Sequence, residues 1–287
     1  MTVRKPSAYR LHPPRASSDR VPCPVRLALR IAYDGTDYQG WQIQPGVRSI
    51  QGELEQTLER LTGIQARIHG SGRTDRGVHA RGQIAHVDLP FAPPLDKLRI
   101  GFNALLNTDI RILSLRIVRP TFHARFDATG KEYRYFIWND TVLPPFVRLY
   151  RAHVRPPLNI GAMRMASTLL TGHHDFASFT ANPNREVNGT ERTLYELKVS
   201  RRGPEVTITA CGDGFLFRMV RSLAGHLIRV GLGEVAPEQT SGILQSRLRT
   251  ACVPTAPPQG LFLWNVAYRR GPKAPSHSAG KSPVSLR

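Results

Sequence analysis

The chain has 287 residues and a hydrophobic fraction of 40%, which is enough to bury one large core or two moderate ones. Lysine and arginine total 40 against 21 aspartates and glutamates, so the formal charge of +19 predicts an acidic partner and favours nucleic acid. A membrane partner is not expected, since the sequence has neither a long apolar run nor a basic amphipathic helix. Three widely separated cysteines indicate neither a disulfide framework nor a zinc site, which fits a cytoplasmic protein.

Both ends of the chain differ in composition from its middle. Residues 1–24 are rich in arginine and poor in acids, as an organelle transit peptide would be, but their prolines oppose the amphipathic helix that such a peptide needs. We therefore expect residues 1–24 to be a disordered basic extension. Residues 271–287 consist largely of serine, proline, lysine and glycine, and we expect a disordered tail there.

Residues 25–118 are predicted to form a first α+β domain. Apolar and polar residues alternate from Val25 and predict a half-buried strand that turns at residues 33–35. Ser49 can cap a helix whose apolar residues recur at helical spacing, and Gly63 lies just beyond its end. The other elements expected here are strands at 65–69 and 83–89, a helix opened by Pro93-Pro94 that carries Leu98, Phe102 and Leu105, and a strand at 110–118. This order of elements is the ferredoxin-like one.

Residues 119–270 repeat the pattern in outline and are predicted to form a second α+β domain. The expected elements are a strand at 131–138, a helix at 160–170, a hairpin of 193–200 with 205–211, a helix carrying Leu216, Val220, Leu223 and Leu227, a helix near 238–249, and a strand at 261–268. The expected fold class is therefore α+β, with two ferredoxin-like or RRM-like halves whose antiparallel sheets could join edge to edge.

A glycine-rich stretch at residues 70–82 surrounds a single carboxylate, Asp75. Its glycines let the backbone take left-handed turns and approach a ligand closely. Arg73 and Arg76 flank Asp75, and their charge favours the ionised carboxylate, which is the form that a nucleophile or base needs. The residues alone leave a second interpretation open, in which Asp75 forms a tight turn with glycine and the arginines are solvated.

The wider sequence extends this pattern. The stretch Gly-Ser-Gly-Arg-Thr-Asp-Arg-Gly-Val-His-Ala at 70–80 resembles the signature of the TruA family of tRNA pseudouridine synthases. The stretches that agree with the same family, in order and rough spacing, are 32–42, 122–126 with 133–135, 172–176, 214–216 with 219–221, and 256–261. The resemblance covers about residues 25–270. It implies isomerisation of uridine to pseudouridine by base flipping at positions 38–40 of the tRNA anticodon stem-loop, an active-site cleft between the two halves, and a homodimer.

The resemblance also implies roles for particular residues. Asp75 would be the catalytic carboxylate, and Arg221 would pair with it and hold it ionised and oriented. Tyr133 would lie against the flipped uracil, and Arg73 would occupy the space that the flipped nucleotide leaves. The residues alone allow plainer roles, since most helix arginines are solvated, strand tyrosines usually pack in a core, and Arg73 could contact a phosphate.

Neither a metal nor a cofactor is expected. The histidines do not match any ligand spacing, so we interpret them as packing or RNA-contact residues; they are His79, His86, His123, His173 and His174. The glycine-rich stretch also lacks the patterns of nucleotide-binding loops.

Two other functions remain open from the residues alone. The first is a non-catalytic RNA-binding protein built on the same sheet architecture, although the stacking aromatics of an RNA-recognition sheet are not found. The second is a nucleic-acid glycosidase, which would need a second carboxylate. The candidates for that carboxylate are Asp34, Asp37, Asp88 and Asp213.

Overall fold

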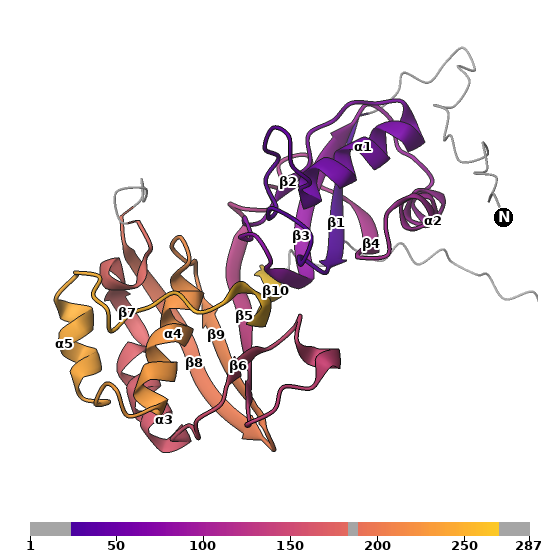
Figure 1. Ribbon diagram of the computed structural model, residues 1–287. Helices are drawn as coiled ribbons and strands as arrows, with labels where there is room; N and C mark the ends of the chain where they lie inside the picture. The colour runs from indigo at the N-terminus through magenta and orange to yellow at the C-terminus, as the bar shows by residue number, and fades with distance from the viewer. Residues whose placement is uncertain (1–23, 183–188, 270–287) are drawn as a thin grey trace, which may run out of the picture.

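The computed structural model describes residues 24–182 and 189–269, and a single ten-stranded sheet runs through them (Figure 1). The strands are β1 (Val25–Tyr33), β2 (His69–Gly70), β3 (His79–Leu89), β4 (Ile110–Val118), β5 (Ala128–Asn139), β6 (Ala152–Val154), β7 (Gly172–Asp175), β8 (Glu191–Arg202), β9 (Glu205–Gly212) and β10 (Leu261–Tyr268). The helices are α1 (Ile50–Thr62), α2 (Leu95–Leu105), α3 (Ile160–Leu170), α4 (Met219–Gly231) and α5 (Gln239–Gln245). The predicted α+β class is therefore confirmed, with a mostly antiparallel sheet.

The first helix shows how the local sequence sets an element. The hydroxyl of Ser49 accepts a hydrogen bond from the backbone N–H of Gly52 at 3.2 Å and caps the N-terminus of α1. Gly63 ends the helix with a φ of +75°, a conformation that glycine adopts at little cost. The face of α1 that carries Leu54 and Leu58 is fully buried. The helix predicted from Ser49 to Gly63 is confirmed.

The last strand joins the two halves of the sheet. The strand order is β4-β1-β3-β10-β5-β9-β8-β7, with β2 added to β3 and β6 added to β5. β10 pairs in parallel with β3, where Phe262 faces His79, and antiparallel with β5, where Leu263 faces Tyr133. In Figure 1, α1 and α2 accompany the N-terminal strands, and α3, α4 and α5 accompany the C-terminal ones. The expected edge-to-edge join is thus present, and β10 makes it.

Two predicted strands differ from the structure. Only His69 and Gly70 pair with β3, so the strand predicted at 65–69 is wrong. The backbone of Ile68 instead bonds to side chains of α1: its N–H donates to Glu55 at 2.8 Å, and its carbonyl accepts from Gln51 at 3.0 Å. These bonds satisfy backbone groups that a strand would otherwise have paired. β3 also begins at residue 79, earlier than the predicted 83.

The second half contains further differences. α4 begins at Met219, after Leu216, because Arg218 adopts a φ of +59° that no helix continues through. α5 ends at Gln245, short of the predicted 249, and Arg247 beyond it has a φ of +55°. β6 and β7 were not predicted. The expectations for residues 1–24 and 271–287 fall outside the described residues, apart from Pro24.

The helices of the described residues can be compared with the length and apolar character of a membrane span. Within residues 24–182 and 189–269, no helix combines the length and the apolar character needed to cross a membrane.

A glycine in α4 allows this helix to pack closely on the segment before β10. A Cβ on Gly225 would overlap the carbonyl oxygen of Pro254, whereas a Cβ on Gly242 in α5 would have no atom within 4 Å. We expect Gly225→Ala to lower the free energy of unfolding by about 1–3 kcal/mol, because backbone must move to admit the methyl group. Gly242→Ala, the control, should be neutral or stabilising by up to ~1 kcal/mol. Thermal unfolding followed by circular dichroism measures both, and an unchanged melting temperature for Gly225→Ala would contradict the close packing.

Candidate active site

The loop between β2 and β3 is fixed by buried polar side chains. The hydroxyl of Ser71 donates to the Gln83 side-chain oxygen at 2.6 Å, and the Gln83 amide donates to the carbonyl of Gly72 at 2.8 Å. One residue before Asp75, the Thr74 hydroxyl lies 2.8 Å from the hydroxyl of Tyr33 on β1. Ser71, Thr74 and Gln83 are all buried, so each bond holds the loop in an environment where an unpaired group would be costly.

A turn that follows β1 holds the loop from another side. The backbone N–H of Trp41 donates to the carbonyl of Thr74 at 3.1 Å. Gly40 has a φ of +93°, and a Cβ there would overlap the same carbonyl oxygen. Glycine is therefore required at position 40, both for the backbone conformation and for the close approach. This contact places the stretch at 32–42 against the stretch at 70–80.

Asp75 and Arg221 form a hydrogen-bonded ion pair across the two halves of the chain. Arg221 Nη1 donates to Asp75 Oδ2 at 3.0 Å, and Arg221 Nε donates to the carbonyl of Ala256 at 2.8 Å. The side chain of Arg221 is 11% exposed and that of Asp75 is 22% exposed, so Arg221 is not a solvated helix charge. Arg221 lies in the first turn of α4, and Arg218, which precedes this helix, brings Nε within 3.9 Å of the same Asp75 oxygen. The predicted pairing is present in the structure.

Asp75 opens on a cavity of about 580 Å³. The basic side chains that line this cavity are Arg67, His69, Arg73, His123, Arg125, Lys131 and Arg218. Among the described residues that line it, Asp75 is the one carboxylate. A larger hollow of about 850 Å³ lies along α1 and contains none of the predicted site residues. The cavity at Asp75 is therefore the candidate active site.

Tyr133 and Arg73 line the same cavity. Tyr133, on β5, is only 8% exposed, and its ring packs edge-on against Phe215 with 5.1 Å between ring centroids. Burial, with smaller contributions from Tyr33 and Asp75, raises the pKa of Tyr133 well above its usual range, so its hydroxyl stays protonated. Arg73 is exposed at the cavity wall. All four residues predicted from the resemblance thus meet at one site.

Sequence reasoning gave no role to three other residues of the cavity, which are Lys131, Arg218 and Phe126. Lys131 could have been found, because it lies two positions from Tyr133 on β5 and strand alternation puts both on one face. Arg218 could not, since its approach to Asp75 depends on the backbone turn before α4.

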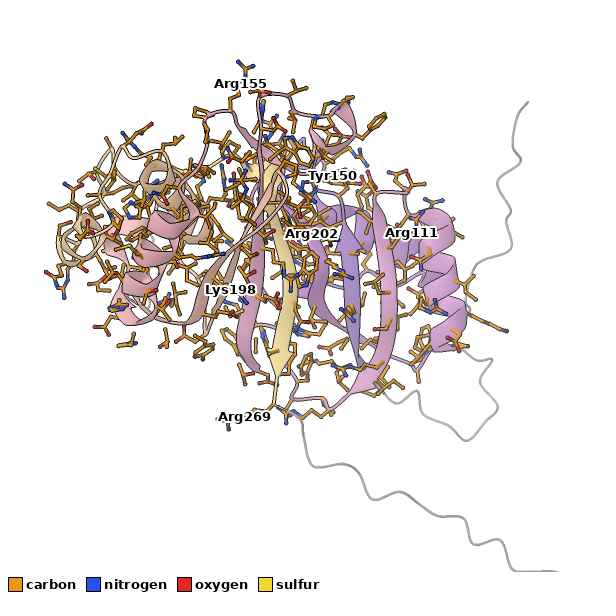
Figure 2. All side chains as sticks on the ribbon, turned by 90° about the horizontal axis from the view of Figure 1, so that it is seen from below. Arg111, Tyr150, Arg155, Lys198, Arg202 and Arg269 are labelled. Atoms are coloured by element: carbon orange, nitrogen blue, oxygen red, sulfur yellow. The ribbon has the colours of Figure 1, made fainter. Side chains whose placement is uncertain are left out.

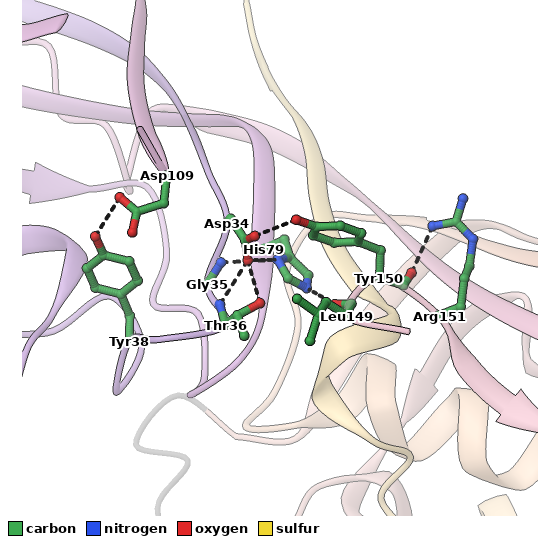
Figure 3. Close-up of polar contacts among 9 residues, drawn as sticks. All are labelled: Asp34, Gly35, Thr36, Tyr38, His79, Asp109, Leu149, Tyr150 and Arg151. Carbon is green, nitrogen blue, oxygen red and sulfur yellow. Dashed lines mark hydrogen bonds and ion pairs between the residues drawn. The ribbon is translucent and has the colours of Figure 1, made fainter. Parts of the chain in front are cut away.

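Two other polar candidates, Asp34 and His79, have structural partners outside the cavity (Figure 3). Asp34 accepts hydrogen bonds from the Tyr150 hydroxyl at 2.6 Å and from Thr36. His79 Nδ1 accepts from the backbone N–H of Gly35 at 3.1 Å, so its Nε2 carries the hydrogen and donates to the carbonyl of Leu149. Burial lowers the pKa of His79 and keeps it neutral, although Asp34 lies 3.1 Å away and opposes this effect.

The other aspartates weighed as second carboxylates also lie outside the cavity lining. Asp88 forms an ion pair with Arg26 at 2.6 Å, and Asp213 accepts from the backbone N–H of Thr193. Over residues 24–182 and 189–269, no group of three or more His, Cys, Asp or Glu side chains is placed to hold a metal ion.

The chain matches known proteins in sequence over most of its length. The sequence profile of a family described as tRNA pseudouridine synthase matches residues 30–127 and 166–269. A protein of Brevibacillus brevis named tRNA pseudouridine synthase A is 45% identical over 85% of this chain and 99% of its own length. Proteins of the same name from Halalkalibacterium halodurans and Bacillus subtilis are 44% and 42% identical, over 83% and 85% of this chain and 90% and 99% of their own lengths.

A solved structure is also similar, but only weakly. A chain of the "Crystal Structure of a Cbf5-Nop10-Gar1 Complex" superposes with a TM-score of 0.32 and 13% identity, over 70% of this chain and 45% of that chain, which is too low to support an argument. The sequence matches are decisive by themselves, and with the site they define an RNA-modifying isomerase. The chain belongs to the family of tRNA pseudouridine synthases.

Two histidines of the cavity lining, His69 and His123, contact a third that is buried behind them. His86, on β3, stacks on His69 with 5.0 Å between centroids and packs against His123 with 4.7 Å between centroids. Burial, followed by the positive charges of Arg26, His123 and His69, lowers the pKa of His86 to about 4. An ordinary histidine titrates near 6.5, so His86 stays neutral at pH values where an unfolded chain would already bind the proton.

This difference predicts a pH-dependent stability. Between pH 6.5 and about 4 the unfolded chain binds a proton that folded His86 does not, so stability falls as the pH is lowered through this window. We expect His86→Phe to lose less of its melting temperature than the parent between pH 7.5 and 5. His173→Phe, at an exposed position, is the control. Equal losses in the parent and in His86→Phe would show that other groups cause the effect.

Proposed function

We propose that this chain converts uridine to pseudouridine at positions 38–40 of the tRNA anticodon stem-loop, with Asp75 as the catalytic carboxylate. The observation that carries the proposal is a carboxylate held by Arg221 in a cavity where the other charged side chains among the described lining residues are basic. The cavity volume of about 580 Å³ lies within the roughly 300–1,000 Å³ typical of small-ligand sites, so it can admit one flipped nucleotide. The relatives named tRNA pseudouridine synthase A support the same assignment.

The reaction needs one ionised carboxylate and no outside atom. The bond between N1 of uracil and C1′ of ribose breaks, the base turns, and C5 bonds to C1′. The proton lost from C5 is balanced by the one that N1 gains. Asp75 can act by adding to the sugar or base, or by removing the 2′ proton to form a glycal, and both routes use the same carboxylate. Arg221 is the positioning residue, because it is bonded to Asp75 on one side and to the backbone of Ala256 on the other.

Tyr133 and Arg73 would handle the nucleotide itself. The Tyr133 ring lines the cavity, and its protonated hydroxyl can hold the base as it turns and help to move the C5 proton. Arg73, exposed at the wall, can fill the space left by the flipped nucleotide or contact a phosphate.

Positive charge over the whole molecule supports a large polyanionic substrate. Cations lie on well-separated parts of the molecule in Figure 2, among them Arg111, Arg155, Lys198, Arg202 and Arg269. Each phosphate that they neutralise releases counterions, which favours binding of a whole tRNA over a free nucleoside. We further propose that 25–118 and 119–270 are two ferredoxin-like halves, which the order β4-β1-β3-β2 in the first half supports.

The two alternative functions are less favoured. A glycosidase of the usual kind needs two facing carboxylates, and no second one is found among the described residues that line the cavity. A non-catalytic RNA-binding protein has no need for a carboxylate inside a cationic cavity, where it would repel phosphate. Asp75 therefore favours catalysis over binding alone.

Substitution of Asp75 tests the proposal directly. Asp75→Asn keeps the size of the side chain, and its amide oxygen can still accept a hydrogen bond from Arg221. We expect tRNA affinity and melting temperature close to the parent's, and isomerisation at least ~10³-fold slower because the anion is lost. Tritium release from tRNA labelled at uracil C5, filter retention of tRNA and thermal unfolding measure the three quantities.

The control for this substitution is Asp88→Asn, which removes an exposed carboxylate outside the cavity and should leave isomerisation unchanged. Tritium release near the parent's rate would remove Asp75 from the mechanism. Loss of the fold together with activity would instead favour a structural turn at Asp75.

For Tyr133→Phe we expect near-normal tRNA affinity with isomerisation slowed about 10²–10⁴-fold, because the ring is kept while the hydroxyl is lost. Single-turnover tritium release and filter retention separate the two effects. Tyr195→Phe, exposed on β8, is the control. Unchanged turnover in Tyr133→Phe would limit Tyr133 to packing or stacking.

A further inference from the structure

An aromatic side chain stands exposed in the cavity wall. Phe126 precedes β5, lines the cavity with Asp75 and is 74% exposed. Its ring lies 4.2 Å from that of His123, which packs on buried His86, and His86 stacks on His69. Phe126 is thus the outermost ring of a stack that is anchored on β3. We call Phe126, His123, His86 and His69 the ring stack.

The ring stack is held in place by backbone hydrogen bonds. His123 Nδ1 accepts from the N–H groups of Arg125 at 3.1 Å and of Phe126 at 3.3 Å, and His86 Nδ1 accepts from the N–H of Ala124 at 3.2 Å. The loop that carries Phe126 is therefore preorganised, and a ligand that stacks on this ring has little loop ordering to do. Unpaired RNA bases commonly bind by stacking on such exposed aromatic rings.

Lys131, on β5, lines the same cavity. Lys131 takes part in none of the hydrogen bonds and ion pairs found among the described residues, and its ammonium group lies beside Gly72 of the Asp75 loop. The charged groups that act on it are Arg125 and Arg192, both of them cations. Burial, together with these two arginines, lowers the pKa of Lys131 to about 8. A phosphate at this point would supply the missing negative charge.

We propose that the cavity wall formed by Phe126 and Lys131 binds a second nucleotide of the RNA, adjacent to the flipped uridine, with its base stacked on Phe126 and its phosphate bound to Lys131. This inference rests on the proposed function, which places the flipped uridine between Asp75 and Tyr133. The Phe126 ring contacts His123 and the guanidinium group of Arg125 but is still 74% exposed, and no hydrogen bond or ion pair of Lys131 is found among the described residues. Both groups are then left for a neighbouring nucleotide.

The test couples protein variants to changes in the RNA. In a first set of stem-loop RNAs, each RNA lacks the base at a different loop position. In a second set, each RNA carries an uncharged methylphosphonate at a different linkage in place of the phosphate. Fluorescence anisotropy measures the affinity of each RNA for the parent, Phe126→Ala and Lys131→Met. We expect Phe126→Ala to bind the intact stem-loop about 5- to 150-fold more weakly, the range that one stacked base provides. This loss should disappear for the RNA that is abasic next to the target uridine.

Lys131→Met should likewise weaken binding of the intact RNA, and the loss should disappear for one methylphosphonate next to the same uridine. The controls are Phe146→Ala and Lys97→Met, which change exposed residues outside the cavity and should show no such coupling. Phe126→Leu keeps an apolar side chain without the aromatic ring, and Lys131→Gln keeps a polar side chain without the charge; these replace any variant that does not fold.

Equal weakening of every RNA by the variants, or no weakening at all, would overturn the second nucleotide site. Tritium release by the parent enzyme separates this outcome from failure of the proposed function. A parent that isomerises tRNA but shows no coupling removes the second site alone, whereas a parent that does not isomerise tRNA removes the function on which it rests.

Discussion

The guanidinium group of Arg221 joins three parts of the chain, and the geometry of the cavity depends on it. It bonds to Asp75 in the N-terminal half, lies on the first turn of α4 in the C-terminal half, and holds the carbonyl of Ala256 in the segment that leads into β10. The backbone of Arg221 also accepts a hydrogen bond from the N–H of Ala256. A largely buried cation is costly unless it is paired, so these bonds tie loop, helix and strand to one arrangement. The same bonds aim the carboxylate of Asp75 at the cavity.

The charges in the cavity lining are unbalanced. Its walls hold basic side chains close together, and only Asp75 among the described lining residues offers a compensating charge. The like charges of such a wall repel one another in the free protein. Burial lowers the pKa of Lys131, and repulsion by Arg125 and Arg192 lowers it further. A polyanion relieves this repulsion when it binds. Hydrogen bonds fix the loop that holds Asp75 and the loop that carries Phe126. They keep the site organised in the absence of RNA, when repulsion between the basic side chains would otherwise push the cavity walls apart.

The elements with complete local signals could be predicted from the sequence. Ser49 and Gly63 bound α1 because a cap and a left-handed end are local properties of the chain. The strand at 65–69 could not be excluded in this way, because the groups that bond Ile68 are the side chains of Gln51 and Glu55 on α1. The start of α4 could not be predicted either, because the residue with left-handed backbone is Arg218 and not a glycine, the residue type that usually indicates this conformation.

For the site, the sequence by itself determined the residue types and the loop: a lone aspartate among glycines and arginines, within a motif that resembles one family. It also determined that Lys131 and Tyr133 share a strand face, because alternation is a property of the strand alone. The family resemblance implied that Arg221 pairs with Asp75, 146 positions earlier in the chain, but only the tertiary structure brings the two side chains together. The tertiary structure also decided that β10 joins the two halves. The physical reason is that local sequence controls backbone conformation, whereas contacts between distant residues depend on how the sheet assembles and on which buried polar groups must find partners.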